Sequence, residues 1–265
     1  MQRTCLLLSA LLATVLVPAA AQARQDYPVA FVERPLTLPK LMLSPWLSVG
    51  HSRVTPRYSD PDHTVLSLGA ALGLNDYFEI EAQALPLWLY PQVRYGQARF
   101  GATAGFAAGP VELGLNANVA VRSPDYDVGG NVWLHDPWTL SFGIPLVIHA
   151  GKKVRIETGF RTAIALPDRA EEVVSFFVPV GVYIQPVRVF FFGVDTGVGI
   201  GNLRRDSTYV PVSGTVGFTV PHRRRPLVDF TASVGFPSLV TLPNGVVVHG
   251  DVWTLGAAAR FYVQL

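Results

Sequence analysis

Apolar and polar residues alternate along most of the chain after residue 40. The stretch 111–121 shows this most clearly, because apolar residues occupy every second position and Glu112, Gly114, Asn116 and Asn118 lie between them. Successive side chains of a β-strand point to opposite faces, so this stretch would have one apolar and one polar face. Twelve stretches carry the pattern: 41–49, 65–74, 78–88, 97–106, 111–121, 138–148, 154–166, 174–184, 188–200, 210–220, 228–236 and 252–265.

The connections between these stretches are of two alternating kinds. Five are short, at 75–77, 107–110, 150–153, 185–187 and 221–226. Six are longer, at 51–64, 89–96, 122–137, 167–172, 201–209 and 237–251. Membrane barrels have short turns at one end and long loops at the other, and tilted strands of about ten residues. The pattern predicts an all-β fold, an up-and-down antiparallel transmembrane β-barrel of 12 strands with both ends on the periplasmic side.

Aromatic residues on the apolar faces provide an independent check. If successive strands run in opposite directions, these residues collect at two levels. The level near the long loops contains Trp88, Trp138, Phe176, Phe236 and Trp253. The level near the short turns contains Phe78, Phe106, Phe190, Phe218 and Phe261. Two aromatic belts are typical of a barrel that spans a bilayer, whereas a soluble barrel would scatter these residues or turn them inward.

The composition agrees with a strand-rich membrane protein. Gly (24) and Pro (21) are too frequent for a helical protein, and only 15% of residues are charged while 49% are hydrophobic. A net charge of +2 does not indicate binding to nucleic acid. Cys5 is the only cysteine, and it lies in the expected signal peptide described below. We therefore expect no disulfide and no thiol chemistry in the mature chain.

The first forty residues differ from the rest. Arg3, a short apolar run at 6–17 and the small residues of 21–23 predict a secretory signal peptide over 1–23. Residues 24–40 contain three prolines, Pro28, Pro35 and Pro39, and we expect an extended periplasmic lead-in. Residues 41–265 would form the barrel.

The last alternating stretch, 252–265, has an apolar face bounded by Trp253 and Phe261 and contains no proline. It resembles the closing strand of Gram-negative outer-membrane β-barrel proteins, which the barrel assembly machinery recognises. The resemblance implies location in the cell outer membrane, with outer-membrane lipids including lipopolysaccharide and that machinery as partners. It does not indicate an oligomeric state.

Charged and amide residues of both signs occupy the polar faces of the strands. The candidates for lining the lumen are Glu79, Glu81, Arg99, Glu112, Asn116, Asn118, Arg155, Glu157, Arg161, Arg188, Asp195, Asp229 and Arg260. Two interpretations stay open: a charged constriction that filters solutes, or a paired network that fills and stabilises a narrow barrel. Glycines on the same faces would leave room and favour an open path: Gly101, Gly105, Gly114, Gly193, Gly197 and Gly199.

The sequence offers little for catalysis or metal binding. No histidine pair has the spacing of a helical zinc site, so we expect no metal and no cofactor. Outer-membrane phospholipases resemble this chain in size and strand number, but they need a Ser and a His on adjacent lipid-facing positions. Of the histidines, His51 alone extends an apolar face, and no partner serine is evident. The basic run 222–225 is expected to be a solvated periplasmic turn, with contact to an acidic partner or lipid headgroups as the alternative.

Together these patterns favour a narrow passive pore or transport channel for small polar solutes. A non-conducting scaffold or surface-interaction barrel is the alternative, and a lipid-modifying enzyme is a weaker one.

Overall fold

The structure is a computed structural model that describes residues 27–54, 62–90, 93–121, 126–128, 132–134, 138–166, 173–201, 208–242 and 252–265. The expected signal peptide lies outside these residues. Among them, no helix is long and apolar enough to cross a membrane.

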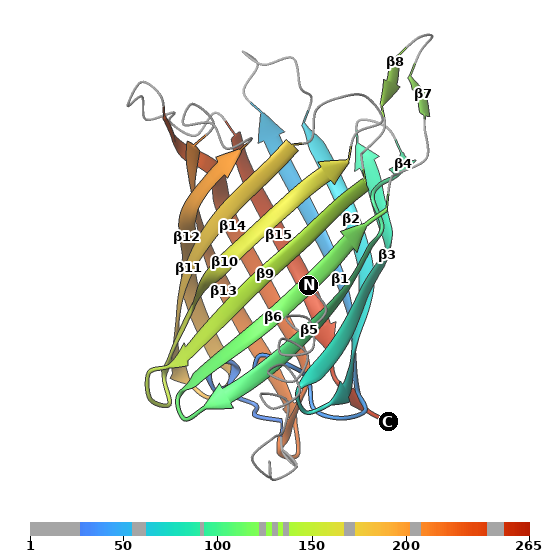
Figure 1. The fold of residues 1–265 in the computed structure, drawn as a ribbon. Helices are drawn as coiled ribbons and strands as arrows, with labels where there is room; N and C mark the ends of the chain where they lie inside the picture. The colour runs from blue at the N-terminus through green and yellow to red at the C-terminus, as the bar shows by residue number, and fades with distance from the viewer. Residues whose placement is uncertain are drawn as a thin grey trace, which may run out of the picture.

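Twelve long antiparallel strands form a closed, up-and-down barrel, which confirms the predicted fold (Figure 1). Each contains one of the stretches predicted from alternation, trimmed or extended by a few residues. Their bounds are β1 Met42–Val54, β2 His63–Asn75, β3 Phe78–Tyr90, β5 Arg99–Ala108, β6 Val111–Ala120, β9 Trp138–His149, β10 Val154–Leu166, β11 Val173–Val187, β12 Phe190–Gly201, β13 Thr208–His222, β14 Arg225–Leu242 and β15 Val252–Phe261.

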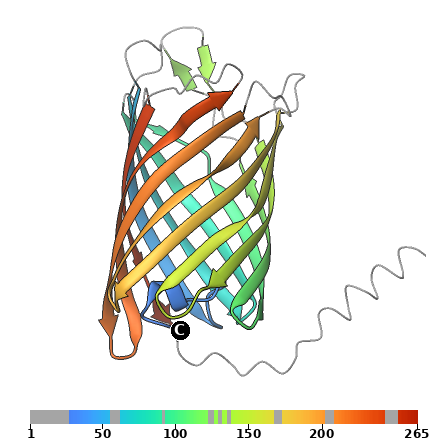
Figure 2. The same cartoon turned by 90° about the vertical axis from the view of Figure 1, so that its left-hand side faces the viewer.

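Four short strands accompany the wall. β4 (Arg94–Tyr95) pairs with β3, while β7 (Tyr126–Val128) and β8 (Val132–Leu134) form a hairpin above the loop end (Figure 2). β16 (Val263–Gln264) continues β15 after a break at Tyr262 and pairs with β1. The connections at the opposite end are short, as predicted.

The barrel closes where the first and last long strands meet. β1 pairs with β15 from Trp46↔Arg260 to Val54↔Val252, and β16 extends the seam with Met42↔Gln264. Closure leaves the twelve described strands of the wall without a free edge, as a structure in hydrocarbon requires, because lipid offers no hydrogen-bonding partner.

The outer face of the barrel is apolar and the inner face is polar. Leu115, Phe142 and Val194 point outward, and each is at least half exposed. In contrast, Ser44 and Thr219 face inward and are fully buried. A water-soluble protein would have these faces reversed, so this wall suits a lipid surrounding.

Most of the predicted belt aromatics lie on the outer face. Phe106, Phe190, Phe218 and Phe261 are exposed near the turn end, and Trp138 and Phe236 are exposed near the loop end. Phe78, Phe176 and Trp253 are half-buried on the same face.

Trp88 departs from its predicted place. A bulge shifts the β2–β3 register between Leu68↔Leu85 and Gly69↔Gln83, which reverses the alternation in the upper part of β3. Leu85 and Leu89 are therefore exposed outside, and Trp88 turns to the other face, where its ring lies 4.8 Å from that of His63.

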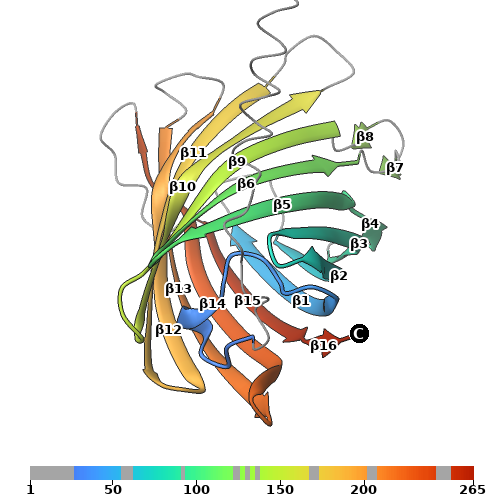
Figure 3. The same ribbon diagram turned by 60° about the horizontal axis from the view of Figure 1, so that its bottom comes forward.

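The lead-in enters the barrel. From Tyr27, the chain runs across the turn end of the lumen, forms a single 3-10 turn at Phe31–Glu33 (η1), and returns to β1 (Figure 3). Tyr27, Val29, Val32 and Leu38 are all buried. The segment remains extended apart from η1, but the inner wall of the barrel surrounds it.

Candidate functional site: the lumen and its lead-in

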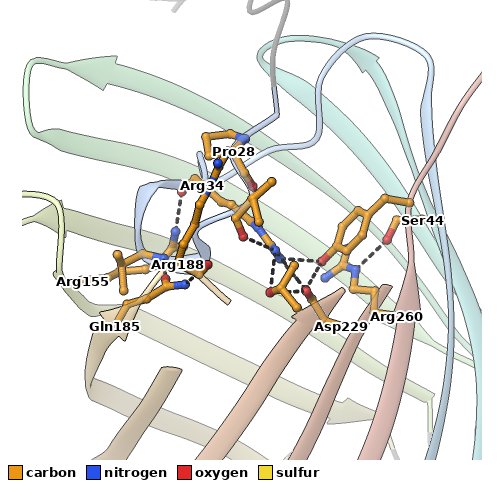
Figure 4. Close-up of polar contacts among 12 residues, drawn as sticks. Pro28, Arg34, Ser44, Arg155, Gln185, Arg188, Asp229 and Arg260 are labelled. Atoms are coloured by element: carbon orange, nitrogen blue, oxygen red, sulfur yellow. Dashed lines mark hydrogen bonds and ion pairs between the residues drawn. The ribbon is translucent and has the colours of Figure 1, made fainter. Parts of the chain in front are cut away.

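Arg34 anchors the lead-in inside the barrel (Figure 4). Its guanidinium bonds both carboxylate oxygens of Asp229 on β14, with 3.0 Å from Nη2 to Oδ1. Nη1 also donates to the Tyr262 hydroxyl (2.9 Å), and Nη2 to Thr219 Oγ1 (3.2 Å). The side chains of Arg34 and Asp229 are only 3% and 6% exposed. Two-point pairing with further hydrogen bonds is the arrangement that a buried ion pair needs.

Aromatic packing holds the turn at η1. The Phe31 ring stacks on Phe191 with centroids 4.2 Å apart and meets Tyr183 edge-on at 5.2 Å. Beside it, the backbone of Val32 is bonded at both ends. Its N–H donates to Gln185 Oε1 (3.0 Å), and its carbonyl lies 2.7 Å from His149 Nδ1.

Wall carboxylates bind the backbone of the second half of the lead-in. The N–H of Leu36 donates to Glu112 Oε2 (2.6 Å) on β6, and the N–H of Leu38 donates to Glu79 Oε2 (2.9 Å) on β3. Arg155 on β10 donates to the carbonyl of Arg34. These wall groups thus replace the strand partner that an extended backbone normally requires.

Inward glycines provide the space in which the lead-in lies. A Cβ at Gly73 would be 2.1 Å from the Pro39 carbonyl oxygen, and one at Gly114 would be 2.4 Å from a Leu36 methyl carbon. At Gly105, a Cβ would lie 3.5 Å from that of Leu36. At these three glycines the lead-in packs directly against the barrel wall.

The remaining inward glycines receive side chains of the wall. Rings of Tyr183, Phe177 and Tyr209 lie over Gly193, Gly197 and Gly199 respectively, and the Asn118 amide lies over Gly101. Each of these glycines therefore accommodates a neighbouring side chain.

The charged candidates divide into two levels. At the turn end, Glu79, Glu112, Arg155 and Asp229 are buried and contact the lead-in. Arg260 lies beside them, bonded to Ser44 Oγ (2.7 Å) and over the Tyr262 ring.

Above the lead-in, the lumen contains a chamber of about 620 Å³. The predicted residues that line it are Glu81, Arg99, Asn116, Asn118 and Arg161. Asn116 donates to Thr103 Oγ1 (2.7 Å), and Asn118 donates to Asn116. Trp46 and Phe177 complete part of the wall.

Arg99 lies opposite Gln83 on β3 and Ala120 on β6. The predicted carboxylates of these two strands, Glu79, Glu81 and Glu112, lie nearer the turn end. Within the described residues Arg99 has no ion pair. The side chain of Arg161 extends over Gly143 on the neighbouring strand β9. A Cβ added at Gly143 would lie 3.5 Å from the Arg161 Cγ.

Three further candidates are placed individually. Glu157 pairs with Arg155 at 2.6 Å, and Asp195 accepts a 2.6 Å hydrogen bond from Tyr183. Arg188 lies in the turn between β11 and β12 with its side chain exposed, and its carbonyl accepts from Gln185. The strand that was expected to begin at residue 188 begins at Phe190.

Sequence reasoning missed the residues that bind the lead-in from the polar face, chiefly Tyr183, Gln185, Phe191 and Tyr262. The available signal was the combination of large aromatics and glycines on one polar face, since a water-filled lumen does not need both. Arg34 gave no signal, because an arginine in a proline-rich segment is usually solvated.

His51 lies on the outer face near the loop end, as predicted. Its Nδ1 is 3.0 Å from Thr64 Oγ1 on β2, and its ring lies 5.9 Å from that of Trp253. Across the described part of the chain, no cluster of three or more His, Cys, Asp or Glu side chains could hold a metal ion.

No known protein family matches the sequence, and no curated protein matches it. Solved structures do match the fold. The COG4313 outer membrane channel from Pseudomonas putida F1 aligns with a TM-score of 0.60 at 12% identity, over 90% of this chain and 98% of that one. The NanC porin aligns with a TM-score of 0.57 at 8% identity, over 82% and 100%. At these identities the likeness concerns the fold alone, and the fold is that of the outer-membrane β-barrels.

Proposed function

We propose that this protein is a narrow passive channel for small polar solutes in the outer membrane. The observation that carries the proposal is the chamber of about 620 Å³ inside a barrel with an apolar exterior. Its wall combines two arginines, Arg99 and Arg161, with amide and hydroxyl groups. Such a wall can replace the hydration of a polar solute as the solute passes.

Structural neighbours support this proposal. The two solved structures described above are named as an outer membrane channel and a porin. The exposed apolar residues and aromatics of this chain suit a bilayer, so we further propose outer-membrane lipids, including lipopolysaccharide, as its surroundings. We also propose the barrel assembly machinery as a partner, because apolar and polar residues alternate in the last stretch, 252–265, as in the closing strands that this machinery recognises.

Conductance of refolded protein in a planar bilayer tests the proposal. A channel gives discrete current steps. Arg99→Ala removes a positive charge from the chamber and should shift ion selectivity towards cations, more strongly at low salt where screening is weak. Arg188→Ala is the matched control, because Arg188 lies in a turn outside the chamber. Absence of current steps in the wild-type protein would favour the scaffold alternative.

A lipid hydrolase is the second candidate, and one observation bears on it. His51 and Thr64 face each other on adjacent strands at hydrogen-bonding distance, as a base and a hydroxyl nucleophile would. However, no described residue bonds Nε2 of His51, so the third, orienting group of such a site is missing among them. We expect no phospholipid turnover, and no effect of His51→Ala on conductance.

A further inference from the structure

The lead-in contacts almost the whole circumference of the lumen. Its packing contacts and hydrogen bonds extend from Gly73 on β2, which Pro39 approaches closely, through β3, β6 and β9–β12, to Asp229 on β14. A segment that reaches opposite walls must cross the space between them. In a barrel of intermediate size, such a segment takes up much of the available cross-section.

The chamber ends on this segment. Leu36 is the lead-in residue that lines it, beside Asn116 and Gly143 of the wall. Leu36 also fills the space over Gly105 and Gly114. A solute that leaves the chamber towards the turn end therefore meets Leu36 before it meets the charged residues at that end.

Both halves of the lead-in are firmly held. Arg34 is bonded on all sides by the wall and by the carbonyls of Pro28 (3.0 Å) and Val29 (2.9 Å). At the other end, Leu38 packs in a buried cluster with Tyr27, Met42 and Tyr262. No buried side-chain polar atom in the described chain lacks a hydrogen-bond partner. Releasing the segment would expose an ion pair and an apolar cluster together, which argues against a segment that moves easily.

We propose that residues 27–40 are a fixed constriction that sets the conductance of the channel. The turn-end charges Glu79, Glu112, Arg155 and Asp229 hold this constriction and do not select solutes. The proposal rests on the proposed channel function. It assigns the size limit of the channel to the lead-in instead of to the barrel wall.

The first test removes bulk from the constriction. Leu36→Ala takes three carbon atoms from the floor of the chamber and should raise the single-channel conductance. Leu47→Ala makes the same change on the outer face, where Leu47 is exposed, and should leave conductance unchanged. Equal conductance of Leu36→Ala and the wild type would overturn the proposal.

The second test distinguishes a fixed constriction from a gate. Cβ atoms at positions 36 and 105 would lie 3.5 Å apart, within the range that a disulfide bridges. The double variant Leu36→Cys/Gly105→Cys is made in a Cys5→Ser background, which removes the only native cysteine. The two single-cysteine variants serve as controls.

A fixed constriction predicts the same conductance for the oxidised and the reduced double variant. If oxidation abolishes current and reduction restores it, the segment moves and the proposal is overturned. If the wild-type protein conducts no current, the proposed passive pore is rejected. In that case, current from Leu36→Ala but not from Leu47→Ala would still support the lead-in as the obstruction. If neither variant conducts, the constriction is rejected too.

Discussion

Arg34 and Asp229 are 195 positions apart in the sequence and form a bidentate ion pair inside the barrel. Asp229 was predicted to line the lumen, and in the structure it is buried. Its partner comes from the lead-in and not from a neighbouring strand. This pairing converts a wall charge into an attachment point for a segment that precedes the barrel.

Arg34→Ala should destabilise the barrel strongly. The substitution leaves the buried carboxylate of Asp229 without its counter-charge, and breaking a buried pair in this way costs about 3–5 kcal/mol. Urea unfolding of the protein refolded into lipid vesicles would measure this cost. Arg188→Ala removes an exposed arginine from a turn and should have little effect. Similar unfolding curves for the two variants would contradict the anchoring role of Arg34.

Two substitutions on β6 test the assignment of the faces. Ala117 is exposed on the outer face, so Ala117→Arg places a charge in lipid at a cost of roughly 2–4 kcal/mol near the bilayer centre. Asn116→Arg points into the chamber. It loses hydrogen bonds to Thr103 and Ala102 and one from Asn118, whose groups can bond water in the chamber instead, so the net cost should be about 1 kcal/mol. Folding yield in vesicles should fall clearly for the first variant alone. The reverse order would mean that the faces are exchanged.

Two glycines on β13 test the packing of aromatics against the inner wall. A Cβ at Gly217 would lie 2.1 Å from the ring of Phe191, which is fully buried and stacked on Phe31. Gly217→Ala should therefore cost about 1–3 kcal/mol through overpacking. Gly214 has open space around it, so Gly214→Ala is the control on the same strand. Thermal unfolding would compare them, and equal melting temperatures would exclude a tight contact at Gly217.

The junction between lead-in and barrel has an unusual backbone. Leu41 has a φ of 58°, a conformation that glycine adopts freely and that β-branched residues resist. Its N–H bonds the carbonyl of Gly73 at 2.7 Å, so the turn is well defined. We expect Leu41→Val to be less stable than Leu41→Gly by about 1–2 kcal/mol in the same urea titration. A valine variant as stable as the glycine variant would show that the junction relaxes.

Alternation was sufficient to predict the barrel, because the period of a strand is two and one face must meet lipid. It failed where the period was interrupted. The bulge in β3 turned Trp88 away from the outer belt, and the turn before Phe190 removed Arg188 from the wall. Each interruption lies within two residues of a proline, Pro86 or Pro186, and a proline inside a strand often accompanies a bulge.

The contents of the lumen could not be predicted from the strands. The polar faces give the same pattern whether they contact water, each other or another segment. Glu79 and Glu112 show the ambiguity, since each was predicted to line the lumen and each bonds the lead-in backbone. Only three-dimensional structure relates these carboxylates to the amides of Leu36 and Leu38.

The position of Tyr262 at the seam has a consequence for how the protein folds. Tyr262 lies between β15 and β16, which pair with β1 at the seam. Its hydroxyl bonds both Arg34 and Asp229. The pocket for Arg34 is therefore incomplete until the last strands of the chain are in place. Pairings between distant parts of a chain form slowly, so we expect the lead-in to dock late. A segment that is synthesised early would then be among the last to be fixed in place.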